Sequence, residues 1–183
     1  MSGTKRTLQD LARLPAGELE QVFARGTTPE VDKLVGYEFM GYNVPFFAKI
    51  LGIKKFRKGF YQHGDETFGY NIPQYQNGLS EPWRSRPVDH NPKRFGFYSV
   101  KKVSPEAKEN KETGAIILNY DDGDNWPWEG SFLRDYVKQA DPDNDDLYLG
   151  KAYVALGPLR IMPSIFIIER LRPAPTPVEH FAK

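Results

Sequence analysis

After residue 60 the chain becomes a succession of short strand-like segments separated by polar turns. Aromatic and β-branched residues, which favour strands, gather in residues 60–62, 68–72, 95–103, 115–120, 132–139, 147–156 and 164–171. Turn clusters of Gly, Asp, Asn and Pro lie between them, for example at 63–66 and 141–146. Because no helical pattern is interleaved with these segments, the sequence excludes a parallel α/β sheet and predicts an antiparallel meander.

A meander of this size is expected to close on itself. An earlier aromatic segment that begins at Leu34 adds a further strand, and open edges on so large a sheet would invite aggregation. The chain has 183 residues, which suits one domain with a substantial core. We therefore predict a single mainly β domain over residues 1–183, folded as an antiparallel β-barrel with N-terminal helices.

Helical patterns are confined to the first third of the chain. Leucines recur at helical spacing in residues 7–25, which Pro15 interrupts, and they predict a pair of short helices that covers the sheet. Apolar residues recur at a similar spacing in residues 46–58, among five cationic residues. This segment predicts a basic amphipathic helix, which either packs on the sheet or lies on an anionic membrane surface. Residues 172–183 are proline-rich and predict an extended tail.

Composition excludes several classes of site. The chain has no cysteine and only 3 histidines, which excludes a disulfide scaffold, a thiol nucleophile and a cysteine-ligated metal. Neither a metal nor a cofactor is expected. With 25 Lys and Arg against 24 Asp and Glu, the formal charge is +1, so nucleic-acid binding is not expected. The sequence lacks a long apolar run, so we expect neither a secretory signal nor a membrane span, and hence a cytoplasmic protein.

The last strand-like segments place polar side chains among apolar ones. Arg134 and Tyr136 share one face of a predicted strand, and Lys151 and Tyr153 share one face of the next. An eight-stranded barrel has room for one small ligand. These four side chains are therefore candidate anchors for a ligand inside the barrel, and a carboxylate is the head group that suits them. The alternative is that this face of the strands meets solvent.

Residues 34–39, Leu-Val-Gly-Tyr-Glu-Phe, follow a short helix and resemble the opening strand of the lipocalin and fatty-acid-binding (calycin) superfamily. Residues 167–171, Ile-Ile-Glu-Arg-Leu, are similar to the arginine-bearing last strand that packs across it. Glu38 stands where that superfamily has a tryptophan. The resemblance implies a lipocalin-like barrel that holds a small hydrophobic molecule. We include Tyr37 and Phe39 of the opening strand among its expected contacts.

A second similarity, over the last third of the chain, is to an uncharacterised bacterial family named for a Gly-x-Trp-x-Gly signature. Its closing pattern is a Tyr-Asp segment, an arginine-bearing strand, Leu-Gly-Lys and Leu-Glu-Arg. The corresponding residues here are 119–121, 133–135, 149–151 and 168–170. This resemblance implies no defined reaction.

The expected architecture is compatible with three functions, of which non-enzymatic binding is favoured. In the first, the barrel binds a small hydrophobic or amphipathic ligand similar to a fatty acid or a polyketide. In the second, it is an isomerase or cyclase for an apolar substrate that uses tyrosines and a buried carboxylate, with Glu38 as the candidate. In the third, the protein makes a peripheral contact with a membrane through residues 46–58.

Overall fold

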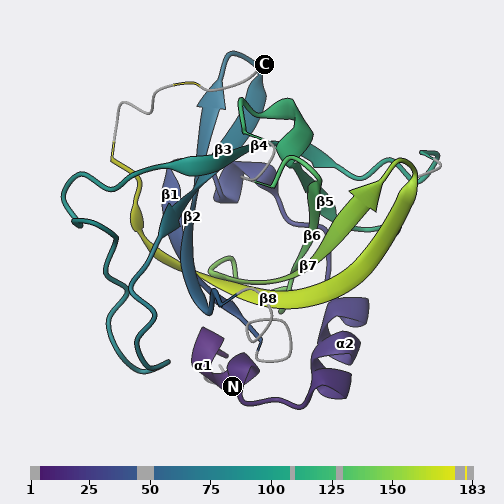
Figure 1. The fold of residues 1–183 in the computed structure, drawn as a ribbon. Helices are drawn as coiled ribbons and strands as arrows, with labels where there is room; N and C mark the ends of the chain where they lie inside the picture. The colour runs from purple at the N-terminus through teal and green to yellow at the C-terminus, as the bar shows by residue number, and fades with distance from the viewer. Residues whose placement is uncertain (1–4, 45–51, 108–109, 127–129, 176–179, 181–183) are drawn as a thin grey trace.

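Eight antiparallel strands form a closed barrel (Figure 1). The computed structural model describes residues 5–44, 52–107, 110–126, 130–175 and 180. Strands adjacent in sequence pair with one another, and β1 against β8 closes the ring. The strands are β1 Tyr37–Asn43, β2 Lys55–His63, β3 Glu66–Pro73, β4 Phe95–Lys102, β5 Ile116–Asn119, β6 Leu133–Gln139, β7 Leu147–Leu156 and β8 Leu159–Pro173. The predicted mainly β antiparallel barrel is confirmed.

The N-terminal helices lie outside the barrel wall (Figure 1). They are α1 Leu8–Ala12 and α2 Ala16–Arg25, and two 3-10 helices occur later, η1 Val31–Lys33 and η2 Tyr120–Asp122. The buried side chains of α1 and α2 pack against residues of β6, β7 and β8. The predicted helical pair is thus confirmed as a cover on the sheet. Within the described part of the chain, no helix is long and apolar enough to cross a membrane.

The predicted helix over residues 46–58 is wrong at its C-terminal end. Residues 45–51 lie outside the described residues, and β2 begins at Lys55. Lys55, Arg57 and Lys58 are only 0% to 2% exposed, so these three cations are not available to a membrane surface. The apolar residues before Lys55 recur at helical spacing, whereas Phe56, Lys58 and Phe60 recur at the period of two that is typical of a strand. The sequence analysis extended the first pattern over the second.

Two residues of the predicted tail over 172–183, Arg172 and Pro173, belong to β8, and residues 176–179 and 181–183 lie outside the described residues. Strand β8 continues to Pro173, and the Ala174 N–H donates a hydrogen bond of 2.8 Å to the Gly36 carbonyl oxygen. The strand therefore ends beside the chain that leads from η1 into β1. This contact places the C-terminal end of β8 at the same end of the barrel as η1.

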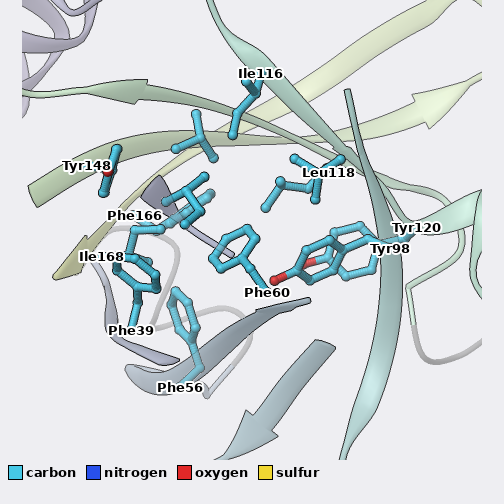
Figure 2. Packing of buried hydrophobic residues seen from close by; sticks show 13 residues of the cluster. Phe39, Phe56, Phe60, Tyr98, Ile116, Leu118, Tyr120, Tyr148, Phe166 and Ile168 are labelled. Carbon is cyan, nitrogen blue, oxygen red and sulfur yellow. The ribbon is translucent and has the colours of Figure 1, made fainter. Parts of the chain in front are cut away.

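Side chains fill the barrel interior. Phe60 lies among other rings there, with its centroid 5.5 Å from that of Phe39 and 5.8 Å from that of Tyr98 (Figure 2). Both contacts have the edge-to-face arrangement that aromatic pairs favour. The same cluster includes Leu34, Phe56, Val100, Ile116, Leu118, Tyr120, Val137, Tyr148, Phe166 and Ile168.

Four glycines of the wall, Gly41, Gly59, Gly69 and Gly150, allow aromatic rings to lie directly on the backbone. A Cβ on Gly41 would stand 2.2 Å from the Phe56 ring, and one on Gly150 would stand 2.1 Å from the Phe166 ring. The two rings are 5.8 Å apart between centroids. Their position therefore depends on a missing side chain at Gly41 and at Gly150.

Candidate functional site

An ion pair crosses the barrel interior. Lys58 of β2 and Asp135 of β6 approach to 3.0 Å between Nζ and Oδ2, and their side chains are only 3% and 5% exposed. Strands β2 and β6 are four places apart in the ring of eight, so the pair joins opposite walls. We call Lys58 and Asp135 the interior ion pair.

Two neutral side chains complete the hydrogen bonding of this pair. Lys58 Nζ donates to Asn71 Oδ1 at 3.0 Å and to the Tyr120 hydroxyl at 2.5 Å. The Tyr120 hydroxyl donates in turn to Asp135 Oδ2 at 2.9 Å. The three ammonium protons of Lys58 thus have three acceptors, namely Asn71, Tyr120 and Asp135.

The surroundings of the interior ion pair are aromatic. Lys58 Nζ lies 4.8 to 5.5 Å from the centroids of four rings, which belong to Phe56, Tyr98, Tyr120 and Phe166. Such contacts stabilise a cation through the ring faces. An ion pair in this setting is nevertheless costly, because apolar side chains of similar size are often as stable or more stable in its place. A charged pair in an apolar barrel therefore marks a candidate functional site.

Burial shifts the proton affinities of the cluster. It lowers the pKa of the Lys58 ammonium, and the adjacent Asp135 carboxylate opposes that change. It also raises the pKa of Tyr98 and Tyr120, and the charge of Asp135 acts in the same direction. Both phenols therefore remain protonated at neutral pH and can serve as hydrogen-bond donors.

The interior ion pair lies within one packed cluster of buried side chains, which includes Phe60 towards η1 and Phe56 and Phe166 towards the opposite end. Towards the opposite end, β7 and β8 contribute the small side chains of Ala152 and Ser164, which are register partners. The rings of Phe56 and Phe166 flank the same region. A ligand that reaches the pair from the end opposite η1 would meet small and aromatic side chains.

The structure places both predicted contacts of β1 towards the η1 end. Phe39 is fully buried in the interior cluster, and its ring centroid is 5.7 Å from that of Tyr148. Tyr37 is half-buried against the same cluster, and the guanidinium of Arg170 lies 3.9 Å from its ring centroid. A contact of either residue with a ligand stays a prediction.

The prediction that Tyr136, Lys151 and Tyr153 face the interior is wrong. Tyr136 and Tyr153 pack in the outer cluster beneath the N-terminal helices. Lys151 Nζ is 2.6 Å from Glu20 Oε2 and 3.3 Å from Glu112 Oε1. The alternation along β6 and β7 has the opposite phase, because residues such as Asp135 take the inward positions. A ligand contact at these outer residues stays a prediction.

Arg134 is also on the outer side of β6. Its Nη1 donates to the carbonyl oxygens of Ser131 and Leu133, both at 2.8 Å, and its Nη2 lies 3.5 Å from Asp121 Oδ2. It lines a groove of about 490 Å³ that opens on the outer wall. The interior therefore holds another cation, Lys58, in place of Arg134.

Glu38, the predicted catalytic carboxylate, is fully buried in an ion-pair cluster. Its Oε2 accepts from Arg172 Nε at 2.9 Å and from Arg57 Nη1 at 3.3 Å, while its Oε1 accepts from the Tyr70 hydroxyl at 3.2 Å. Arg57 also pairs with Asp89 at 3.1 Å. Two arginines thus hold Glu38 as a structural anion, and its catalytic role stays a prediction.

The sequence analysis missed both members of the interior ion pair. Lys58 falls in the segment interpreted as a helix, and Asp135 falls between the residues chosen as anchors. A usable signal is present, because Lys58 stands between Phe56 and Phe60 at strand spacing, and Asp135 between Leu133 and Val137. A single charge on an otherwise apolar strand face indicates a buried partner on another strand.

Comparison with protein-family models, curated proteins and solved structures gave no match to this chain. The interpretation of the barrel therefore depends on its own geometry.

Proposed function

We propose that the barrel binds a small amphipathic molecule whose polar end contacts the interior ion pair. The observation that carries this proposal is the 3.0 Å contact between Lys58 and Asp135 inside an aromatic surround. Ligand sites typically combine an apolar lining with a few polar groups that orient the ligand. The apolar part of the ligand extends from the pair towards the end of the barrel opposite η1.

The polar end of the ligand is a neutral oxygen group. The interior ion pair is charge-balanced, so it offers donors and an acceptor without a net charge. A hydroxyl can replace Asn71 or Tyr120 as an acceptor for Lys58 Nζ. A carboxylate would stand close to Asp135, and two like charges repel strongly in a weakly polar interior. Of the two ligand classes expected from the sequence, a polyketide-like molecule with hydroxyl or carbonyl groups therefore fits better than a fatty acid.

The apolar part of the ligand gains its affinity from burial. Each methylene group removed from water contributes about 0.8 kcal/mol. Phe56 and Phe166 flank the region and supply the apolar contact. In the proposed complex these rings move off Gly41 and Gly150, and the ligand takes their place.

The proposal is tested by isothermal titration calorimetry with decan-1-ol and decanoate, which share a chain and differ in the head group. We expect the wild-type protein to bind decan-1-ol in a 1:1 complex and decanoate at least tenfold more weakly. The variant Lys58→Met/Asp135→Leu keeps an apolar interior and should lose at least tenfold in affinity for the alcohol. Asp135→Asn leaves the Lys58 charge unpaired and should reverse the preference towards decanoate.

Lys151→Met is the matched control for these titrations, because it removes a lysine from the outer wall. It should leave both affinities unchanged. Equal affinity of decan-1-ol for the wild type and for Lys58→Met/Asp135→Leu would refute the proposed site. A loss of affinity in Lys151→Met alone would favour the outer residues that the sequence indicated.

A second candidate function, isomerisation by proton transfer, is favoured by the contact of Tyr120 with Asp135. In this mechanism the Asp135 carboxylate removes a proton from the carbon next to a ligand carbonyl and returns it to another carbon of the resulting enolate. Lys58 and Tyr120 donate hydrogen bonds to the carbonyl oxygen, which becomes negative in the enolate. Asp135 replaces Glu38 as the buried carboxylate of the hypothesis. Deuterium exchange at the α-carbons of decan-2-one, followed by NMR in D₂O, should be faster with wild type than with Asp135→Asn. Equal rates would exclude this function for ketones.

A further inference from the structure

The hairpin between β7 and β8 extends beyond the barrel wall. The pairing of β6 with β7 ends at Leu133 and Val154, and one more backbone hydrogen bond joins Phe132 to Ala155. Beyond that point β7 pairs only with β8, up to Leu156 opposite Leu159. Because β8 ends beside η1, this hairpin tip lies at the opposite end of the barrel.

The hairpin tip and the adjoining start of β6 carry exposed apolar side chains. They are between 37% and 62% exposed, and they belong to Phe132, Leu156, Leu159, Ile161 and Met162. Leu156 and Leu159 are register partners and share one face of the hairpin. Leu156, Leu159 and Ile161 lie on the same face by this register, and exposed apolar side chains gathered in this way mark a contact surface with another apolar phase or molecule.

The other face of the hairpin forms one wall of the 490 Å³ groove. Four cationic residues line this groove, Lys101, Lys102, Arg134 and Arg160, against one acidic residue, Asp122. Lys101 pairs with the exposed carboxylate of Glu66, and Arg134 with that of Asp121. Within the described residues, Lys102 and Arg160 have no carboxylate partner. The groove therefore retains positive charge for an outside anion.

An amide in the same groove points to a missing acceptor. Asn110 lines the groove, and its Nδ2 is buried without a hydrogen-bond partner among the described residues. An unpaired buried donor is costly and is rare in native proteins. Together with Lys102 and Arg160, this donor suits an anion with several acceptor oxygens, such as a phosphate group.

We propose that the β7–β8 hairpin docks the barrel on an anionic phospholipid bilayer, with the apolar tip in the interfacial region and a lipid phosphate in the cationic groove. Apolar side chains that enter the interface and neighbouring cations that meet anionic head groups act together in such binding. The membrane contact expected from residues 46–58 is thereby assigned to residues 156–162. This proposal does not depend on what the barrel interior binds.

The test is co-sedimentation of the full chain with vesicles of phosphatidylcholine, with and without phosphatidic acid. We expect binding that is stronger when phosphatidic acid is present. Leu156→Ser/Leu159→Ser should abolish sedimentation with both vesicles. Lys102→Gln/Arg160→Gln should weaken binding to phosphatidic acid vesicles by about tenfold or more, because each interfacial cation contributes about fivefold. Tyr75→Ser/Val88→Ser, which alters exposed apolar residues elsewhere, should bind as the wild type does.

Three outcomes would overturn the docking proposal. The first is unchanged sedimentation of Leu156→Ser/Leu159→Ser, whose exposed positions make loss of folding unexpected. The second is a dimer that dissociates in this variant, since a second copy of the chain would then cover the tip. The third is binding of soluble glycerol phosphate in the groove without any vesicle binding, which would make the site one for a free phosphate ester.

Discussion

Lys58 and Asp135 link opposite walls of the barrel through a contact of 3.0 Å between Nζ and Oδ2. The partners come from β2 and β6, which are far apart in the chain and never pair as strands. The contact therefore ties the two halves of the ring together through its interior. It also places two opposite charges inside an otherwise apolar barrel.

Removal of one partner should destabilise the protein far more than removal of both. We expect Lys58→Met to lower the free energy of unfolding by about 3–5 kcal/mol, because Asp135 is left buried without a cation. Lys58→Met/Asp135→Leu should regain most of that loss. Urea unfolding measures both values. A double variant no more stable than the single one would show that the pair contributes to stability and is not retained for function alone.

The second prediction concerns the contact between the Phe166 ring and the backbone of Gly150. Gly150→Ala adds a Cβ that would stand only 2.1 Å from the nearest carbon of the Phe166 ring, which is far too close. The ring must move, and we expect a loss of about 1–3 kcal/mol in the free energy of unfolding. Gly17→Ala is the matched control, because nothing lies within 4 Å of a Cβ at that position of α2. It should be neutral or stabilising by up to about 1 kcal/mol.

The Glu38 cluster should behave as a structural anchor. Glu38→Gln leaves the buried guanidinium of Arg57 with one of its two carboxylates, and we expect a loss of about 3 kcal/mol or more in the free energy of unfolding. Glu66→Gln, which removes an exposed partner of Lys101, should cost less than about 1 kcal/mol. The exchange rate of decan-2-one should be the same in Glu38→Gln and wild type. Loss of exchange in a folded Glu38→Gln protein would restore Glu38 as the catalytic carboxylate.

His180, which stacks on His63, should have a pKa below its ordinary value. The rings of His63 and His180 are 3.6 Å apart between centroids and nearly parallel, and the Tyr61 hydroxyl lies 3.3 Å from His180 Nδ1. Desolvation lowers the pKa of His180 below 6.5, and the charge of His63 acts in the same direction. The neutral His180 imidazole therefore contributes stability above pH 6.5, which is lost as the pH falls through its lowered pKa.

An NMR titration of the imidazole resonances measures this shift directly. His63→Ala removes one of the two causes and should raise the pKa of His180 towards 6.5. A pKa of His180 that stays unchanged in this variant would assign the whole shift to desolvation.

The fold could be predicted from the sequence because the patterns that indicate its strands and helices are local. Period-two alternation and turn clusters identify strands wherever they occur, and the chain after residue 60 has little else. The helical pair at the N-terminus has equally local signals in its leucine spacing and in Pro15. Closure of the ring needs no specific residue, since the open edges alone favour it.

The candidate site was harder to predict from the sequence. It depends on which alternate residues of each strand face inward and on contacts across the barrel. Arg134 and Asp135 are adjacent, and a one-residue choice of phase decides which of them faces inward. Covering helices make the outer face of β6 and β7 nearly as apolar as the inner face, so composition does not distinguish the two. Lys58 and Asp135 are 77 positions apart in the chain, and only the closed ring brings them together.

A crystal structure of the complex with 10-bromodecan-1-ol would show whether the ligand lies inside the barrel, since the bromine locates the end of the chain. We expect one molecule inside the barrel, with its hydroxyl oxygen about 3 Å from Lys58 Nζ and its bromine towards the end opposite η1. A ligand bound only on the outer wall near Lys151, with Phe56 and Phe166 still resting on Gly41 and Gly150, would contradict this expectation.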